Sequence, residues 1–394
     1  MILKALKKQI KWPWWPLLPL YPYGQRKTIF KELIPNKVWC FDQLQGTYYV
    51  AIPIRLIVAK VNGGLMLFNP LPPTEELLNS LKRLEDLHGP VKSIVLPTAS
   101  GLEHKIPLPF LLRFFPDAKI WICPGQWSFP LNLPLEWIGI PKNRTNILFA
   151  DGLPHKECCD WITLGPLDIG PGRFQEISCF HKLSNSLLVT DALVAIASSP
   201  PEIFDFDPTP LLFHARDRGD MPLEDSDDIR RKGWSRIVLF ASFLRPKYLD
   251  IPSLSYVLKN AFKRDLFKPK AHFGLYPFDW KDGWETSTKE ILGEKKPKIQ
   301  IAPVIERLVF PRAKIAFSDW LNELKKIKTM KWLISSHYSS LVVFSQKDLN
   351  ILIRDIKSRK WAIDSENWGF LGWLDKKLLK LRVVPKDPLR KFRD

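Results

Sequence analysis

The segment 38–96 constrains the fold more than any other part of this chain. Two apolar runs meet at Asn62-Gly63, a pair that favours a tight hairpin turn because both of its residues must adopt positive φ. Thr74 then begins a predicted helix in which leucines recur at helical spacing, and Gly89 ends it. An apolar strand over 91–96 follows. Strands that alternate with helices in this way indicate an α/β fold.

The rest of the chain continues this alternation and becomes more helical in its second half. Its 394 residues are enough to bury a large core, either in one elaborated domain or in two smaller ones. The apolar runs and their spacing predict strands at 118–123, 161–164, 174–180, 187–190 and 332–334, and helices at 227–244, 253–264, 285–292, 302–328 and 346–360.

Three apolar strands end in side chains that can bind a metal or move a proton. Glu103 and His104 follow the strand 91–96, Asp191 follows a second strand, and His337 follows a third. Loops at strand ends often carry the chemistry of such folds. Each residue also has a structural interpretation: the histidines could be surface or packing residues, and Asp191 could be the N-cap of a helix.

Four further side chains are candidates for contact with a substrate. His214 and Arg216 follow an apolar run and suggest a polar cluster at the edge of the core, although a buried salt bridge between Arg216 and an acid would explain them as well. His181 lies in a predicted strand, where a hydrogen-bonded sheet residue is the structural alternative. Arg173 follows Gly172 in a turn that either binds an anion through its N–H groups or is a plain turn.

The loop after the strand 91–96 resembles the metal-binding motif of the metallo-β-lactamase superfamily. In that family an apolar strand is followed by Thr-His-x-His-x-Asp-His, and Thr98 and His104 match its two ends. Glu103 stands where the family has Asp. The resemblance implies an α/β (α+β) fold, a four-layer αββα sandwich of metallo-β-lactamase type with a more helical C-terminal half.

The resemblance also implies that one of the two metal positions of the family is lost. Ala99 and Gly101 stand where the family has two histidines, and the third histidine would fall near Pro171 or Gly172, neither of which can bind a metal through its side chain. The ligands of the other metal correspond to Glu103, His104, Asp191 and His337.

Two imidazoles and two carboxylates suit one divalent cation such as zinc, iron or manganese. Glu103 and Asp191 would be the catalytic carboxylates that orient a water molecule. The implied activity is hydrolysis of an ester, a thioester or a lactone by a single-metal enzyme. The alternative is a non-catalytic binding or scaffold protein on the same fold, and the small-molecule substrate stays open.

More narrowly, the chain resembles an uncharacterised family of this superfamily, a domain of unknown function found in oxygenic phototrophs and plastids. The resemblance extends from about Arg26 to Phe344. The segments that carry it are Phe41-Asp-Gln-Leu-Gln-Gly46, Leu96-Pro-Thr-Ala-Ser-Gly-Leu-Glu-His-Lys105, Gln126-Trp-Ser-Phe-Pro-Leu-Asn-Leu-Pro134, Gly170-Pro-Gly-Arg-Phe174 and Leu211-Leu-Phe-His-Ala-Arg-Asp217.

The two ends of the chain differ from its centre in composition. We expect a basic arm rich in Trp and Pro over residues 1–27, a metallo-β-lactamase-like domain with insertions over 28–360, and a basic tail over 361–394. The arm has lysines and tryptophans and no acid before Glu32, which is typical of segments that lie on a membrane surface. It either packs on the domain or contacts an anionic membrane through residues 1–23.

The net charge and the cysteines limit which partners and which cellular compartment we expect. The formal charge is +18, yet the lysines are spread along the chain and no nucleic-acid-binding motif is present, so we do not expect nucleic acid as a partner. Five cysteines without a paired spacing indicate buried thiols in a reducing compartment. The sequence therefore predicts a cytoplasmic or plastid stromal protein, peripheral to a membrane if the arm binds one, and not a secreted protein.

Overall fold

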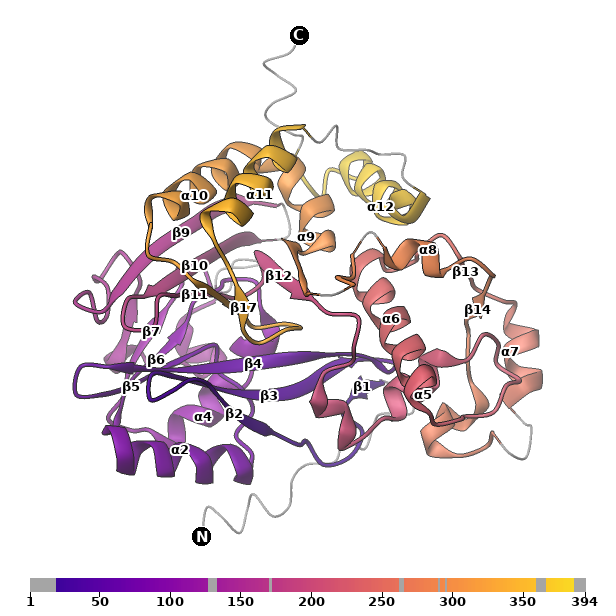
Figure 1. The fold of residues 1–394 in the computed structure, drawn as a ribbon, viewed down its shortest axis with the longest axis horizontal. Coiled ribbons are helices and arrows are strands. Elements are labelled where there is room, and N and C mark those ends of the chain that lie inside the picture. Colours follow the sequence, from indigo (N-terminus) through magenta and orange to yellow (C-terminus); the bar gives the residue numbers. More distant parts are fainter. Residues whose placement is uncertain are drawn as a thin grey trace.

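Two sheets pack face to face in the computed structural model of this chain (Figure 1). The structure describes residues 19–126, 133–169, 172–261, 266–289, 291–294, 296–358 and 366–385. Most of the predicted N-terminal arm, residues 1–18, lies outside the described residues, and so does Pro171.

The first sheet has eight strands in the order β1-β3-β4-β5-β6-β7-β8, with β2 also paired to β3. Its first part is antiparallel, and β5 to β8 run parallel to one another. The predicted hairpin is confirmed, because β4 and β5 pair on either side of Asn62-Gly63. The strands are β1 (Leu20–Tyr21), β2 (Ile29–Ile34), β3 (Val38–Thr47), β4 (Val50–Val61), β5 (Gly64–Phe68), β6 (Val91–Leu96), β7 (Lys119–Ile122) and β8 (Thr145–Ile147).

The second sheet has five strands in the order β17-β16-β11-β10-β9. At its centre β11 and β16 are parallel although they are distant in sequence, with Ser186 paired to Trp332 and Val189 paired to Ser335. The strands are β9 (Cys159–Asp168), β10 (Arg173–His181), β11 (Ser186–Val189), β16 (Trp332–Ser335) and β17 (Val342–Val343).

The layers follow from how the faces of the two sheets are covered. Between the sheets, buried side chains of the first sheet such as Phe68 and Val95 pack against Ile177, Leu188 and Ile334 of the second. The outer face of the first sheet is covered by α2 (Glu75–His88) and α4 (Leu108–Leu111), and that of the second sheet by α10 (Lys314–Lys326) and α11 (Gln346–Ser358). The short helix α3 (Leu102–Lys105) lies in the connection after β6. The predicted four-layer αββα sandwich is therefore confirmed.

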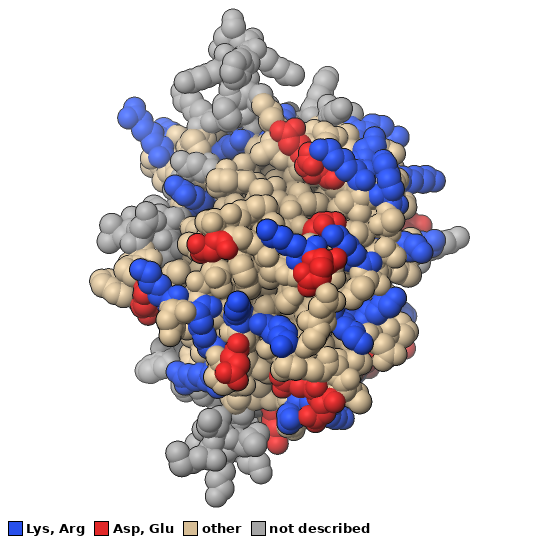
Figure 2. Space-filling model, turned by 90° about the vertical axis from the view of Figure 1, so that its left-hand side faces the viewer, with Lys and Arg blue, Asp and Glu red and all other residues tan. Residues whose placement is uncertain are grey.

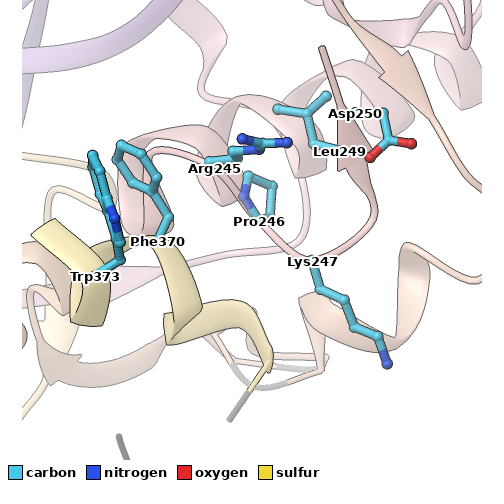
Figure 3. Close-up of a pocket in the computed structure, with 7 residues that line it drawn as sticks. All are labelled: Arg245, Pro246, Lys247, Leu249, Asp250, Phe370 and Trp373. Carbon is cyan, nitrogen blue, oxygen red and sulfur yellow. The ribbon is translucent and has the colours of Figure 1, made fainter. Parts of the chain in front are cut away.

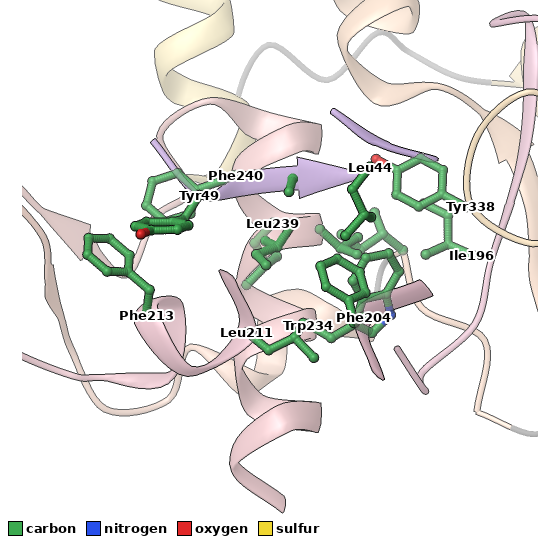
Figure 4. Close-up of a cluster of buried hydrophobic side chains, with 14 of the residues drawn as sticks. Leu44, Tyr49, Ile196, Phe204, Leu211, Phe213, Trp234, Leu239, Phe240 and Tyr338 are labelled. Atoms are coloured by element: carbon green, nitrogen blue, oxygen red, sulfur yellow. The ribbon is translucent and has the colours of Figure 1, made fainter. Parts of the chain in front are cut away.

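A third group of elements packs on one end of this sandwich (Figure 1). Its core is aromatic: Trp234 packs against Phe204, and Tyr49 packs against Phe213 (Figure 4). Its elements are α5 (Thr209–Ala215), α6 (Asp227–Phe243), α7 (Leu254–Ala261), α8 (Glu285–Thr288), the strand pair β12 (Leu193–Ile196) and β15 (Lys298–Ile301), and the strand pair β13 (Leu249–Asp250) and β14 (Asp279–Trp280).

The remaining helices are short or lie near the C-terminal end. The helix predicted over 302–328 is interrupted: α9 (Pro303–Leu308) ends before a 3-10 turn, and α10 begins after it. The last helix is α12 (Gly369–Lys380). The 3-10 helices are η1 (Leu112–Phe114), η2 (Leu135–Ile138), η3 (Lys142–Arg144), η4 (Glu202–Asp205), η5 (Pro269–Gly274), η6 (Phe310–Arg312) and η7 (Glu366–Trp368).

Charge and cysteine placement agree with the sequence-based expectations where the structure describes them. All five cysteines are buried and free, as predicted. On the face that Figure 2 shows, basic side chains are spread out with acidic ones between them and do not gather into one patch. No helix in the described ranges is long and apolar enough to cross a membrane.

Candidate functional site

Three strand ends meet at one edge of the sandwich and carry the predicted site. The loop after β6 brings Glu103 and His104 on α3, the turn after β11 brings Asp191, and the loop after β16 brings His337. One ligand atom each from Glu103, His104 and His337 lies within 4.8 Å of the other two. Asp191 joins them, since its Oδ1 lies 2.9 Å from Nε2 of His337. The four residues predicted to act together are thus neighbours in space.

His337 is held from both sides of its ring. Its Nδ1 lies 3.0 Å from the carbonyl oxygen of Pro53, which can only accept, so this nitrogen carries the proton. Its Nε2 faces two carboxylates, Asp191 at 2.9 Å and Glu103 at 3.9 Å. Burial lowers the pKa of His337, but the hydrogen bond and the charge of Asp191 outweigh burial and leave this pKa raised.

His104 has the same arrangement with one difference. Its Nδ1 lies 3.0 Å from the carbonyl oxygen of Pro70, so this ring also presents an unprotonated Nε2 when neutral. That Nε2 is buried and has no hydrogen-bond partner among the described residues. Burial lowers the pKa of His104, which favours the neutral ring. A fully buried lone pair that faces Glu103 and His337 is therefore available to a ligand.

Glu176 fixes the turn that carries Asp191, and the sequence analysis did not find it. This carboxylate is fully buried on β10 and accepts hydrogen bonds from the backbone N–H groups of Thr190, Asp191 and Ala192, each at 2.8 Å. Burial, and then the charge of Asp191, raise the pKa of Glu176 to about 7. The available signal was a single carboxylate inside the predicted strand 174–180, whose other residues are uncharged. The alternative that Asp191 caps a helix is wrong, because β12 follows it.

A buried ion pair fixes the loop that carries His337. Arg55 on β4 and Asp42 on β3 are paired across the two strands, with Nε of Arg55 2.6 Å from Oδ1 of Asp42. The same guanidinium donates to the carbonyl oxygens of Ser335 at 2.5 Å and Tyr338 at 3.0 Å. Both acceptors flank His337, so Arg55 positions this histidine without contacting it.

Asn69 ties the three loops to one another. This residue follows β5 with a φ of 64°, a conformation that asparagine tolerates better than most residues. Its Nδ2 donates to the hydroxyl of Ser336, and its Oδ1 accepts from the hydroxyl of Thr190 at 3.0 Å. One amide therefore links the end of β5 to the residues just before His337 and Asp191.

Ala99 and Gly101, where the metallo-β-lactamase motif has histidines, lie in closely packed surroundings. Ala99 is buried between the sheets. A Cβ atom on Gly101 would lie 2.9 Å from both Oε1 of Glu103 and Cγ2 of Thr98. Lys105 donates to the carbonyl oxygens of Ala99, at 2.7 Å, and of Gln126, and burial lowers the pKa of this lysine to about 8.

The structure does not bring the four other candidates to this point. His181 lies at the opposite end of β10, where its ring nitrogens contact Ser184 at 2.7 Å and the carbonyl of Lys60 at 2.8 Å. Arg173 is exposed at the start of β10. His214 is fully buried on α5, with Nε2 3.1 Å from the carbonyl oxygen of Tyr48.

Arg216 is also buried, but among the described residues it does not form the salt bridge with an acid that was its structural alternative. Its guanidinium stacks on the rings of Tyr276, at 4.3 Å, and Phe213, at 4.8 Å. The neighbouring Asp217 pairs instead with Arg236 and Lys232. Aromatic faces therefore take the place of the expected acid beside Arg216.

A pocket of about 520 Å³ opens onto the candidate site. Glu103 and His337 lie at one end of it, and β4 and α6 form its sides. It is lined by Gln45, Gly46, Thr47, Val50, Ile52, Ile54, Glu103, Phe240, Ala241, Leu244 and His337.

A second pocket, of about 420 Å³, lies between α12 and the segment after α6, where Phe370 and Trp373 approach Arg245 (Figure 3). None of the four predicted ligands lines that second pocket.

Comparison with known proteins adds a family to this geometry. The family described as "Domain of unknown function (DUF4336)" matches residues 35–354. No protein of curated function matches the chain.

Several solved structures are similar to the chain at low sequence identity. A metallo-β-lactamase from Pontibacter korlensis is 10% identical, with 84% of this chain and 100% of that chain covered and a TM-score of 0.38. A flavodiiron core, Flv1, from Synechocystis sp. PCC6803 is 13% identical, with 86% and 63% covered and a TM-score of 0.41. A putative diflavin flavoprotein fragment from Nostoc sp. PCC 7120 is 11% identical, with 90% and 100% covered and a TM-score of 0.39.

Proposed function

This chain belongs to the family described as a domain of unknown function, DUF4336, and from that premise we propose that it is a hydrolase that depends on a single divalent metal ion. The proposed ligands are Glu103, His104, Asp191 and His337. The proposed substrates are esters, thioesters or lactones. In this proposal the chain lacks the first metal position of the metallo-β-lactamase motif and keeps the second.

The unpartnered Nε2 of His104 carries this proposal. A buried polar atom without a hydrogen bond is unfavourable by about 1–3 kcal/mol, so such an atom is usually satisfied by water, an ion or another ligand. Here the atom faces an imidazole and a carboxylate within 4.8 Å. Both rings are oriented through Nδ1 by backbone carbonyl groups, which is the usual way in which metal-binding histidines are held.

The set of donor atoms fits a small divalent cation. Two imidazole nitrogens and two carboxylates suit zinc, iron or manganese better than calcium or magnesium, which prefer oxygen ligands alone. The short contact between Asp191 and His337 would be replaced by two bonds to the same ion. When bound, such an ion polarises a carbonyl oxygen and lowers the pKa of water.

The residues of the chain would supply position and a proton acceptor. Glu103 is only partly buried and lines the pocket, so its carboxylate can reach a substrate or a water molecule there. Glu176 accepts hydrogen bonds from three backbone N–H groups of the turn that carries Asp191, and these bonds fix the position of Asp191. Glu103 and Asp191 are therefore the proposed catalytic carboxylates.

Metal content tests the proposal directly. We expect the full chain, purified without chelators, to hold about one equivalent of zinc, iron or manganese, as measured by mass spectrometry of the metals. His104→Ala and His337→Ala should lower this content at least tenfold. His181→Ala is the matched control, because it removes a buried histidine of the same sandwich whose nitrogens contact other groups. A parent protein without metal would contradict the proposal.

Hydrolysis is the second measurement. Esters, thioesters and lactones should be cleaved by the metal-loaded chain, and chelation should abolish the cleavage. Glu103→Gln removes the proposed proton acceptor at nearly constant size. We expect it to lower kcat by about 10²–10⁴-fold while the protein stays folded.

A non-catalytic binding or scaffold protein is the second candidate, and one observation favours it. The loss of the histidine positions at Ala99 and Gly101 leaves half of the superfamily's ligand set. Metal binding without cleavage of any of the three substrate classes would support this alternative over the hydrolase.

The setting of the protein is also a proposal. We propose that it acts in the cytoplasm or the plastid stroma of an oxygenic phototroph, with residues 1–23 in contact with an anionic membrane. Fractionation of cells or plastids with an antibody to the chain tests the compartment. Recovery in a secreted fraction would contradict it.

A further inference from the structure

We infer that the pocket beside Glu103 and His337 binds an uncharged alkyl chain. If the proposed function holds, this alkyl chain is the acyl group of an uncharged ester; that identification rests on the proposed function.

The first wall is a stripe of apolar side chains along β4. Val50, Ile52 and Ile54 are two residues apart, so they project from the same face of the strand. Ile54 forms a bridge with His337, which places the inner end of the stripe at the candidate site. At about 3.3 Å per residue, the stripe extends roughly 13 Å from Ile54 to Val50. A chain bound along it would begin at the reactive end and lead outward.

The second wall comes from the end of α6. Phe240, Ala241 and Leu244 face the stripe on β4 across the pocket. Phe240 is buried, whereas Leu244 is 45% exposed, with a φ of 59° that is unusual for leucine. Large apolar side chains therefore border the pocket from its inner end to its mouth. The volume of about 520 Å³ is within the range of small-molecule sites.

The lining has charge only where the reaction would occur. Glu103 and His337 are the ionisable residues among the described residues of the lining, and no lysine or arginine is among them. The whole chain has 59 lysines and arginines, so this lack of cations is a local property. A phosphate or carboxylate on the substrate chain would lose water and find no lysine or arginine to pair with in this lining, which is unfavourable. An alkyl chain would gain free energy for each methylene that leaves water.

Binding of primary alcohols tests the inference without any need for turnover. The full chain is titrated with butanol, hexanol and octanol in a calorimeter. We expect the affinity to rise about fourfold for each added methylene, as burial of apolar surface predicts. Equal affinities for the three alcohols would overturn the inference.

Two variants locate the alcohol in this pocket. Ile52→Asn alters the middle of the β4 stripe, and Leu244→Asn alters the exposed mouth, where a polar side chain does not endanger folding. Each should lower the affinity for octanol by tenfold or more. Ile315→Asn is the matched control, because Ile315 is 60% exposed on α10 and outside the pocket. Octanol affinity that is the same in both pocket variants as in the control would overturn the inference.

Ester hydrolysis separates this inference from the proposed function. If the chain binds octanol as expected, p-nitrophenyl hexanoate should be cleaved with a higher kcat/KM than the acetate, and Leu244→Asn should reduce that preference. Alcohol binding in this pocket without metal or hydrolysis would reject the proposed function and support the alkyl site. Hydrolysis with no preference for chain length and no alcohol binding would support the enzyme and overturn the alkyl site.

Discussion

Backbone carbonyl groups orient both imidazoles of the candidate site. Pro53, which lies within β4, and Pro70, which follows β5, supply these acceptors. Because an imidazole that donates through Nδ1 presents a lone pair at Nε2, the fold selects the tautomer that a metal needs. A side-chain acceptor could rotate away, whereas these carbonyls are fixed by the chain.

Gly101 gives a prediction at the scale of a single Cβ atom. In Gly101→Ala the new methyl group would lie 2.9 Å from Oε1 of Glu103 and from Cγ2 of Thr98, so the carboxylate must move. We expect metal affinity to fall about tenfold or more, as measured by titration with zinc. Gly369→Ala adds the same methyl group where no atom lies within 4 Å, and it should leave the affinity unchanged. A Gly101→Ala protein with the parent affinity would show that Glu103 is not a ligand.

His214 gives a prediction about acid stability. Burial lowers the pKa of His214 to about 3 in the folded chain, whereas an unfolded histidine titrates near 6.5. The folded state therefore keeps the ring neutral, so its contribution to stability is complete above about pH 6.5 and is lost as the pH falls toward 3. In that window the free energy of unfolding should fall by up to about 1.4 kcal/mol per pH unit for this group.

Chemical denaturation at several pH values measures this dependence. His214→Gln should unfold with a shallower dependence on pH between about 6 and 4 than the parent does, because glutamine does not titrate. His88→Gln serves as the control, since His88 lies near the surface at the end of α2. Identical slopes in the parent and in His214→Gln would rule out a neutral buried ring as the cause.

At the scale of elements, local signals in the sequence predicted the hairpin, the first helix and several strands. Asn62-Gly63 and Thr74 act through their immediate neighbours, so their effect can be read without knowing the fold. The strands β2, β12 and β15 are among those that were not predicted, and β12 and β15 pair with each other although they are distant in sequence. The predicted helix over 302–328 was interrupted for a local reason, since it contains a proline at 311, which cannot donate a backbone hydrogen bond.

The residues of the candidate site also fall into those that the sequence predicted and those that it did not. The four proposed ligands could be predicted because a sequence motif and strand ends mark them. Glu176, Arg55 and Asn69 could not, because their roles depend on partners that are distant in sequence: Arg55 contacts the carbonyl of Ser335, 280 positions away. A charged residue among uncharged neighbours in a strand is the signal that the sequence offered for Glu176 and Arg55.

The ion pair between two strands and the loop after β16 gives a prediction at this scale. Arg55→Met leaves the buried carboxylate of Asp42 unpaired, and we expect the free energy of unfolding to fall by about 3–5 kcal/mol. Adding Asp42→Leu should restore most of this stability, because an apolar pair can replace a buried ion pair. Metal affinity should stay low in the double variant, because no guanidinium holds the carbonyls of Ser335 and Tyr338.

Denaturation and metal titration of the same samples separate the two roles of Arg55. Arg218→Met is the control, since Arg218 is exposed and pairs with Asp220 at the surface. If the double variant recovered both stability and metal affinity, Arg55 would have no positioning role.

At the scale of the whole molecule, the positive charge and the candidate site are separate features. The net charge is +18, yet the pocket has no lysine or arginine among its described lining residues. On the face shown in Figure 2, basic and acidic side chains are interspersed. Charge of this kind acts at long range on encounters with anionic surfaces and does not select the substrate.

The lysines before the first strand give the prediction about such a surface. Deletion of residues 1–18 should remove binding to liposomes that contain anionic lipid and spare the fold, because Leu20–Tyr21 stays paired with β3 and Tyr21 stays bonded to Asp207. Replacement of Lys4, Lys7, Lys8 and Lys11 by glutamine should weaken binding roughly fivefold per lysine, since each contributes about 1 kcal/mol near an anionic surface. Neutral liposomes are the control for both variants. If co-sedimentation with anionic liposomes is unchanged by the deletion, the arm does not bind the membrane and the basic charge has another role.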